Sequence, residues 1–384
     1  MSRGAATKER MALVERGAEE ILTRDELHAL LEEGAPLKHY IGFEISGMIH
    51  LGTGLMCMSK VRDFIEAGFE ATILLADWHS WINDKLGGDR AIIREIALGY
   101  FAEGMKASLR CVGGDPGAVN FVLGSDLYRD NEDYWATVVE VSKHTSLARM
   151  QRSISIMGRQ EGEAVDFAKL LYPPMQVADI FVQGVTLAHA GMDQRKAHVI
   201  ARDVARQLKI RPLLAEDGHA RRKPVAVHHP LILGLGKPPV WPMPLEKSRD
   251  LLTSMKMSKS DARSAIFIHD SPDEIRTKVR RAFCPPGEAS FNPILDWARH
   301  LVFGLDEGRT LLVHRRHDPG TTFDSYEQLE AAYVRQQVHP MDLKDAVAER
   351  LVELLGPARR HFEEPIPRTG LQRLEQVLAS SQEG

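Results

Sequence analysis

Cysteine is scarce in this sequence, with three residues among 384. Cys57, Cys111 and Cys284 lie far apart in apolar surroundings, and no two of them have the spacing of a metal site or a redox motif. The scarcity excludes a disulfide framework. We interpret all three as reduced core residues and expect no metal site built from protein ligands alone.

Long hydrophobic runs and a strong net charge are missing as well. No stretch approaches the roughly 18 apolar residues that cross a bilayer, and the opening MSRGAATKERMALVERGAEE lacks the apolar centre of a signal peptide. A formal net charge of −4 excludes a polycation that coats nucleic acid indiscriminately. We therefore expect a cytoplasmic protein without membrane contact, in which any surface for nucleic acid is a local basic patch.

What is present is a globular composition, 43% hydrophobic and 27% charged, long enough for two or three domains. Short apolar runs alternate with amphipathic stretches between residues 37 and 265. The expected strands are 40–43, 71–76, 119–123, 185–188 and 225–227, and the expected helices are 52–67, 91–110 and 132–158. This alternation predicts an α/β fold, a Rossmann-like doubly wound parallel sheet that binds ligands at the carboxyl ends of its strands.

The two ends of the chain have a different pattern. Residues 1–36 read as a helical lead-in, with a capping pattern from Thr23 to Glu26. After residue 266 the strand signal fades, and segments that begin at Pro272, Pro293 and Tyr326 have helical patterns. We expect residues 266–384 to form an α-helical C-terminal domain and residues 129–171 to form a helical insertion in the α/β domain of residues 37–265.

Two short motifs carry polar groups suited to phosphate chemistry. His50-Leu-Gly-Thr follows the first strand and opens a helix, whose N-terminus attracts phosphate; Gly52 permits close approach and His50 adds a donor. Taken alone, this could equally be a turn with a capping histidine. The second motif, LTSMKMSKSD at residues 252–261, carries two lysines three residues apart, and alone it reads as a solvated loop.

Together, the motifs resemble the His-Ile-Gly-His and Lys-Met-Ser-Lys-Ser (KMSKS) signatures of class I aminoacyl-tRNA synthetases. The resemblance implies that both hold ATP while an amino-acid carboxylate attacks its α-phosphate. Thr53 stands where that family has a second histidine and cannot carry charge, so His50, Lys256 and Lys259 are the expected catalytic residues. The residues implied in ATP binding are Gly42, His50, Gly52, Thr53, Asp193, Lys256, Ser258, Lys259 and Ser260.

Longer matches along residues 20–360 select a subfamily. They are Tyr40-Ile-Gly-Phe-Glu, Leu74-Leu-Ala-Asp-Trp-His, Leu171-Tyr-Pro-Pro-Met-Gln-Val-Ala-Asp-Ile, Gly191-Met-Asp-Gln-Arg-Lys, Cys284-Pro-Pro-Gly and His339-Pro-Met-Asp-Leu-Lys. These segments resemble tyrosyl-tRNA synthetases of the archaeal and eukaryotic type. The match is looser at Leu127-Tyr128, Gln183 and His189-Ala190, where the pocket wall could differ.

The resemblance gives the phenol hydroxyl of the substrate to Tyr40 and Asp179. A carboxylate and a tyrosine hydroxyl supply the one acceptor and one donor that a phenol needs, and phenylalanine would leave both unsatisfied. No editing domain is therefore expected. The residues implied at the α-amino group are Tyr172, Gln176 and Gln194, with Glu44 beside them. His79 either lines this pocket or is a satisfied core histidine.

The resemblance also implies a tRNA surface. Residues matching Arg152, Arg195 and Lys196 contact the first base pair of the acceptor stem in that family, a task that suits the planar fork of arginine. His317, His339 and Asp342 match its anticodon-reading region. From spacing alone, the same basic residues could belong to solvated helix faces.

The expected function is tyrosine–tRNA ligation: L-tyrosine reacts with ATP to give tyrosyl-adenylate and pyrophosphate, and the tyrosyl group then passes to tRNA(Tyr). Mg²⁺ is expected with ATP, and a homodimer through residues 129–171 is implied. The alternatives are a tryptophanyl-tRNA synthetase, an adenylylating enzyme without charging activity, and a tRNA-binding protein. Asp179, Tyr40 and the 191–196 segment argue against the tryptophanyl alternative.

Overall fold

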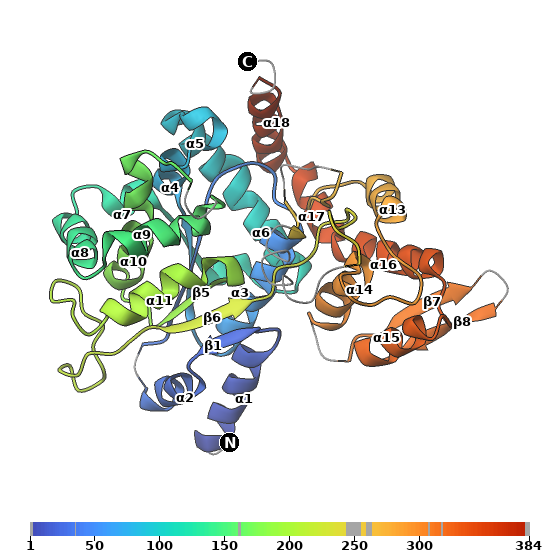
Figure 1. The fold of residues 1–384 in the computed structure, drawn as a ribbon, viewed down its shortest axis with the longest axis horizontal. Coiled ribbons are helices and arrows are strands. Elements are labelled where there is room, and N and C mark those ends of the chain that lie inside the picture. Colours follow the sequence, from blue (N-terminus) through green and yellow to red (C-terminus); the bar gives the residue numbers. More distant parts are fainter. Residues whose placement is uncertain are drawn as a thin grey trace.

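A computed structural model describes residues 3–34, 36–159, 163–242, 255–258, 263–305, 308–315 and 318–380. A six-stranded sheet with helices on both faces lies at its centre, in the order β1-β6-β5-β2-β3-β4 (Figure 1). The strands are β1 (Glu20–Leu22), β2 (Lys38–Phe43), β3 (Glu70–Leu75), β4 (Val119–Leu123), β5 (Leu187–Gly191) and β6 (Val225–His229). Neighbours from β6 to β4 pair in parallel, which confirms the predicted fold class.

The strand order places a switch point between β2 and β5. From β2 the chain adds β3 and β4 on one side, and then returns to add β5 and β6 on the other. Helices that leave neighbouring strands in opposite directions open a crevice at the carboxyl ends of those strands. Any ligand of this sheet is therefore expected where β2 and β5 end.

Each face of the sheet is covered by its own hydrophobic cluster. Ile41 and Ile73 pack toward α3 (Cys57–Glu66) and α6 (Ala102–Cys111). On the opposite face, Tyr40 and Leu74 pack toward α10 (Tyr172–Val182) and α11 (Arg195–Val204). The alternation of side chains along β2 thus sends Tyr40 and Ile41 to opposite layers.

The helices agree broadly with the sequence pattern. The predicted helix 52–67 begins as a π-helical turn at Gly52–Met56 and continues as α3, and the Thr23–Glu26 capping box opens α2. The predicted helix 132–158 is divided into two helices and a 3₁₀ turn at Ile154–Met157. Further α-helices in the described residues before 272 are α1 (Arg3–Glu15), α2 (Arg24–Glu33), α4 (Asp77–Ile82), α5 (Arg90–Ile96), α7 (Gly124–Tyr128), α8 (Glu132–Lys143) and α9 (Leu147–Ser153).

The predicted lead-in contains a strand that the sequence pattern did not indicate. Between α1 and α2, β1 pairs antiparallel with β6, with Glu20 opposite His228 and Leu22 opposite Ala226. Three residues are too few for an alternating pattern to be recognised, and the strand depends on its pairing with β6. Residues 1–36 are therefore a helical lead-in only in part, because they also supply one edge of the sheet.

The C-terminal region is helical, as predicted, with one exception. Its helices are α13 (Pro272–Arg281), α14 (Pro293–Trp297), α15 (Tyr326–Val334), α16 (Pro340–Leu354), α17 (Gly356–Glu363) and α18 (Pro365–Ser380). A hairpin of β7 (Leu311–Arg315) and β8 (Asp318–Phe323) was not predicted. The Asp318-Pro-Gly segment, which has the composition of a turn, forms the start of β8.

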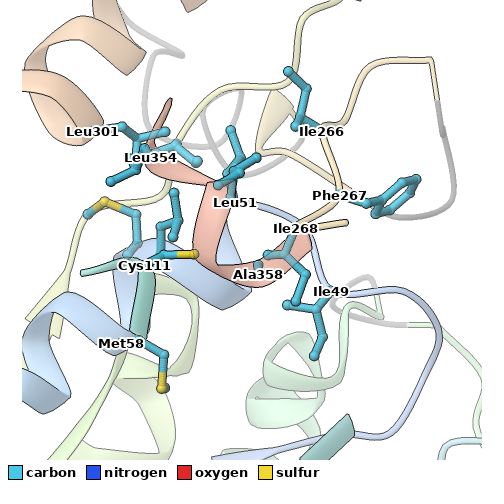
Figure 2. Close-up of a cluster of buried hydrophobic side chains, with 14 of the residues drawn as sticks. Ile49, Leu51, Met58, Cys111, Ile266, Phe267, Ile268, Leu301, Leu354 and Ala358 are labelled. Carbon is cyan, nitrogen blue, oxygen red and sulfur yellow. The ribbon is translucent and has the colours of Figure 1, made fainter. Parts of the chain in front are cut away.

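One hydrophobic cluster crosses the predicted domain boundary at residue 265. Figure 2 shows Leu51 and Ile49 of the catalytic domain beside Ile266 and Ile268, with Leu301 and Leu354 of the C-terminal region close by. The end of the chain also returns to the catalytic domain, since α17 packs on α6 and α18 packs on residues 97–101. The two regions therefore share a core. Within the part of the chain described, no helix has the length and hydropathy of a membrane span.

Candidate active site

A pocket with a volume of about 350 Å³ lies at the switch point, where β2 and β5 end. Its wall includes most of the residues singled out from the sequence for tyrosine and ATP. These are Tyr40, Gly42, Glu44, His50, Gly52, Thr53, His79, Tyr172, Gln176, Asp179, Asp193, Gln194, Lys256 and Ser258. Lys259 and Ser260 lie outside the described residues. The fold thus brings together residues from six separate sequence motifs.

One end of the pocket is closed around Asp179, which is fully buried on α10. Tyr40 donates to its Oδ2 at 3.4 Å, while Tyr128 and Tyr134 donate to its Oδ1 at 3.0 and 3.2 Å. The rings of Tyr128 and Tyr134 are stacked, with centroids 4.1 Å apart. The expected pair of Tyr40 and Asp179 is therefore present, together with two further tyrosines that were not predicted as site residues.

Burial sets the protonation of this carboxyl group. It raises the pKa of Asp179 to about 7, although the hydrogen bonds from Tyr128, Tyr134 and Tyr40 each lower it. The neutral form is favoured by desolvation and the charged form by the three hydroxyls. Near pH 7, Asp179 therefore exchanges between a donor state and an acceptor state, both of which can bind a phenol hydroxyl.

His79 lies against the same carboxyl group but is not charged. Its Nε2 is 3.7 Å from Asp179 Oδ2, and its ring meets Tyr172 edge to face at 4.6 Å. Burial lowers the pKa of His79 to about 3. His79 is thus both a buried core residue and part of the pocket wall.

A polar patch lies next to the aromatic end. Gln176 donates to Gln194 Oε1 at 3.3 Å, and Gln194 donates to the Ile156 carbonyl at 2.8 Å. The buried Gln176 Oε1 has no hydrogen-bond partner in the described part of the chain. Glu44 accepts from Asn83 at 2.8 Å and also lines the pocket. An ammonium group fits here, because it has three donors and these side chains offer acceptors.

The signature turn forms the opposite end of the pocket. The backbone N–H groups of Gly52 and Thr53 donate to His50 Nδ1, at 3.1 and 3.4 Å. The proton of a neutral ring then lies on Nε2, which is 3.2 Å from Thr53 Oγ1. His50 therefore caps the amide groups that were expected to face a phosphate, and its Nε2–H is directed at Thr53 Oγ1.

The start of the lysine motif is attached to the same end. Lys256 donates to Asp193 Oδ2 at 2.5 Å, and Met257 N–H donates to the Ile232 carbonyl at 2.8 Å. Gly234 N–H donates to the Met255 carbonyl at 2.9 Å, so residues 255–257 run antiparallel to 232–234. These contacts hold the Lys256 ammonium over the end of β5.

Two side chains of the C-terminal region hydrogen-bond to the backbone of Leu233, in the segment that pairs with the lysine motif. Asp296 accepts from Leu233 N–H at 2.9 Å, and Trp297 Nε1 donates to the Leu233 carbonyl at 2.8 Å. The backbone of residues 49–51 pairs with that of residues 266–268. Leu51 N–H donates to the Ile266 carbonyl at 3.1 Å, and Ile268 N–H donates to the Ile49 carbonyl at 3.0 Å. The first signature motif is thus hydrogen-bonded directly to residues that follow the lysine motif, whereas the lysine motif is connected to the C-terminal region through residues 232–234.

Comparison with known proteins agrees with this geometry. The family described as tRNA synthetases class I (W and Y) matches residues 32–356. The chain belongs to this family. The tyrosine–tRNA ligase of Thermococcus sibiricus is 58% identical over 348 residues, 90% of this chain and 92% of the relative. That of Pyrococcus abyssi is 56% identical over 360 residues, 93% of this chain and 95% of the relative.

Solved structures separate the two branches of this synthetase family. A tyrosyl-tRNA synthetase from Pyrococcus horikoshii, complexed with L-tyrosine, has a TM-score of 0.92 at 54% identity, covering 95% of this chain and 99% of that one. A tryptophanyl-tRNA synthetase from Aeropyrum pernix has a TM-score of 0.64 at 18% identity, covering 92% and 84%, and so shares the fold alone. The chain is therefore a class I synthetase of the archaeal tyrosyl type.

The residues proposed for tRNA lie outside the pocket of this synthetase. Arg152, Arg195 and Lys196 are exposed, and Lys196 Nζ donates to the Arg152 carbonyl at 2.7 Å, so the three are neighbours. Arg195 also donates to Glu20 of β1 at 2.7 Å. His339 and Asp342 lie at the N-terminus of α16, where His339 caps Met341 N–H. His317 lies outside the described residues.

The residues at which the family match is looser lie in different parts of the structure. Tyr128 contacts Asp179, whereas Gln183 donates to the Asp179 carbonyl from outside the pocket. His189 is buried on β5. No cluster of three or more His, Cys, Asp or Glu side chains that could hold a metal ion occurs in the described ranges.

Proposed function

We propose that this chain is a tyrosine–tRNA ligase that converts L-tyrosine and ATP to tyrosyl-adenylate and pyrophosphate and then transfers the tyrosyl group to tRNA(Tyr). The observation that carries the proposal is a single pocket with the buried Asp179 and Tyr40 at one end and His50 and Lys256 at the other. The names of the relatives and the tyrosine-bound Pyrococcus horikoshii structure support it.

The closed end suits the phenol ring of tyrosine. Its hydroxyl would meet Asp179 Oδ2 and the Tyr40 hydroxyl, which lie 3.4 Å apart. Phenylalanine would separate these groups without replacing their hydrogen bond, at a cost of about 1–3 kcal/mol for each unsatisfied group. Selection for tyrosine therefore follows because phenylalanine would leave Asp179 and the Tyr40 hydroxyl without hydrogen-bond partners.

The polar patch suits the α-amino group. Gln176 Oε1, Gln194 and Glu44 offer acceptors, and Tyr172 lines the same pocket. Binding the ammonium at this point directs the carboxylate of tyrosine toward His50 and Lys256. The attacking oxygen is then held near the α-phosphate, which lowers the barrier by positioning alone.

The open end suits the phosphates of ATP. As the carboxylate oxygen attacks the α-phosphorus and pyrophosphate leaves, negative charge grows on the phosphate oxygens. His50 Nε2–H and the Lys256 ammonium can donate to them, and Lys259 would add a second ammonium. Asp193, released from Lys256, would accept from a ribose hydroxyl. Mg²⁺ bound to ATP would offset part of the remaining charge.

The exposed neighbours Arg152, Arg195 and Lys196 would contact the acceptor stem, and His317, His339 and Asp342 would read the anticodon from the C-terminal region. A homodimer would bury part of the insertion, where Val139, Leu147 and Phe167 are 60%, 62% and 75% exposed. Several large exposed apolar side chains within one segment are typical of an interface. A role in translation implies a cytoplasmic location.

Two assays test the proposal. Tyrosine-dependent ATP–pyrophosphate exchange should be fast, with tryptophan and phenylalanine far slower, and tRNA(Tyr) should be charged. Faster exchange with tryptophan would support a tryptophanyl enzyme. Exchange without charging of any tRNA would support an adenylylating enzyme, and tRNA binding without either activity would support a binding protein. Equal charging of tRNA(Tyr) that begins with a cytosine–guanine pair and of its swapped version would contradict the roles of Arg152 and Arg195.

A further inference from the structure

Three buried histidines on neighbouring strands form a row of hydrogen bonds that ends at the pocket. His39 Nε2 of β2 lies 3.3 Å from His189 Nδ1 of β5, and His189 Nε2 lies 2.8 Å from His229 Nδ1 of β6. The row continues from His229 Nε2 to the Cys57 sulfur at 3.6 Å. None of these four residues was predicted as a site residue, yet His229 and Cys57 line the pocket.

Burial keeps the three imidazoles neutral. It lowers the pKa of His39 to about 3 and that of His229 to about 4, and it lowers the pKa of His189 well below the usual value. A neutral imidazole has one N–H and one bare nitrogen. Each ring can therefore donate in only one direction, and the tautomer of one ring fixes that of the next.

The contacts at the two ends decide the direction. If all three protons are on Nε2, then His39 donates to His189, His189 to His229 and His229 to the Cys57 sulfur. The Cys57 thiol remains able to donate to the Gly52 carbonyl at 3.4 Å. The opposite order would place an N–H on His39 Nδ1, which is buried with no partner in the described ranges of the chain. Orphaned buried N–H groups are rarer than unfilled acceptors.

The row therefore presents the His229 Nε2–H to the pocket, close to Asp193. A Cβ atom placed on Gly191 would lie 2.7 Å from Asp193 Oδ1, 3.0 Å from Leu231 Cδ2 and 3.4 Å from His229 Nε2, so only glycine at this position lets Asp193 and His229 approach the end of β5 together. The contact from His229 to the Cys57 thiol is long, at 3.6 Å, and sulfur is a weak acceptor. A ligand hydroxyl between His229 and Asp193 would be a better partner.

Given the proposed function, we propose that His229 donates from Nε2 to a ribose hydroxyl of ATP beside Asp193, and that His189 and His39 are positioning residues that hold His229 in this tautomer. A ribose hydroxyl can donate to the Asp193 carboxylate while it accepts from His229. The pocket then recognises ATP through a neutral donor and a charged acceptor on one sugar.

Exchange kinetics of three variants test this contact. His229→Phe should raise KM for ATP about 3- to 10-fold, as for the loss of one neutral hydrogen bond, with KM for tyrosine unchanged. His229→Gln, whose amide nitrogen can approximate Nε2, should recover most of the loss. His189→Phe should raise KM for ATP in the same direction, since His229 Nδ1 then has no donor.

A comparison with 2′-deoxyATP and 3′-deoxyATP identifies the hydroxyl. The nucleotide that lacks the contacted hydroxyl should lose affinity in the unaltered protein but lose little more in His229→Phe, because both changes remove the same hydrogen bond. Nitrogen-15 NMR of the histidines should find His229 protonated at Nε2 in the unaltered protein and mixed in His189→Phe.

Three results would overturn the proposal. The first is an unchanged KM for ATP in a folded His229→Phe, and the second is a proton on His229 Nδ1. The third is that His229→Phe loses as much further affinity as the unaltered protein does, both when 2′-deoxyATP replaces ATP and when 3′-deoxyATP replaces it. If His229→Phe does not fold, His229→Gln and the NMR assignment still decide the matter. Failure of the ligase function is distinguishable, because it would abolish exchange in the unaltered protein. ATP binding to the same variants, measured by calorimetry, would then test the His229 contact by itself.

Discussion

At the scale of single residues, the chemistry of the tyrosine end depends on how many hydroxyls reach Asp179. Burial raises its pKa to about 7, and the hydroxyls of Tyr128, Tyr134 and Tyr40 oppose this shift. The sequence motifs predicted Asp179 and Tyr40 as a pair, and the two side chains are hydrogen-bonded in the structure. The motifs did not identify Tyr128 and Tyr134, because these residues lie outside them and reach Asp179 only through the packing of α7 and α8 against α10.

Tyr128→Phe should raise the pKa of Asp179 above about 7, because it removes a 3.0 Å hydrogen bond to the charged form. The ionised fraction at neutral pH then falls, and the pH profile of KM for tyrosine should move to higher pH. Exchange kinetics between pH 6 and 9 would measure the shift. Tyr326→Phe, which removes a hydroxyl bonded to Glu330 far from the pocket, is the control. A profile that does not move would contradict this role of Tyr128.

Asp179→Asn should abolish exchange but stabilise the ligand-free fold at alkaline pH. The native pKa of Asp179, about 7, is above its unfolded value, so the native state retains a proton that the unfolded state releases. The free energy of unfolding therefore falls as pH rises from the unfolded pKa of Asp179 to its native pKa of about 7. The amide introduced by Asp179→Asn does not titrate, so the variant does not lose stability in this way. The difference in Tm between variant and parent should grow from pH 5 to pH 8. A constant difference would mean that Asp179 does not titrate in that window.

At the scale of elements, residues 255–257 of the lysine motif are supported indirectly by the C-terminal region. Trp297 and Asp296 of α14 hold both backbone groups of Leu233, which pairs with Lys256. The sequence predicted the helix and the loop separately. It could not predict their contact, nor could it predict β1 and β7–β8, because short strands are defined by partners far along the chain.

Trp297→Phe should slow the chemical step without weakening tyrosine binding. The change keeps an aromatic ring but removes the donor to the Leu233 carbonyl, a bond worth about 0.5–1.5 kcal/mol, and leaves residues 255–258 less firmly held. We expect kcat for exchange to fall about 2- to 10-fold and KM for tyrosine to stay the same. Trp81→Phe, an exposed residue on α4, is the control. An equal change in both parameters would indicate a general loss of structure.

At the scale of the whole molecule, the predicted boundary at residue 265 does not separate two independent cores. α18 returns to the catalytic domain, where Leu374 is fully buried and Gly370 approaches the backbone of Gly99. Leu374→Ala should therefore lower the free energy of unfolding of the entire chain by about 2–5 kcal/mol. Sequence patterns indicated a helical C-terminal region but contain no information on which surface its last helices cover.

Chemical unfolding followed by circular dichroism and by exchange activity would test this. Both signals should shift together in Leu374→Ala, since one core is weakened. Ile366→Ala, on the same helix but 77% exposed, should change stability by less than about 0.5 kcal/mol. Loss of helical signal at a denaturant concentration that leaves exchange intact would show that the two regions unfold independently.

The backbone bridge between residues 49–51 and 266–268 has a consequence for the order of events during synthesis. The chain from Leu51 to Ile266 forms one long loop, and both signature motifs lie where its two ends meet. Tyr40, Gln176, Asp179 and Gln194 are made well before that loop can close. During synthesis, the residues proposed to bind tyrosine therefore emerge first, whereas the proposed nucleotide site is complete only after residue 268 has left the ribosome.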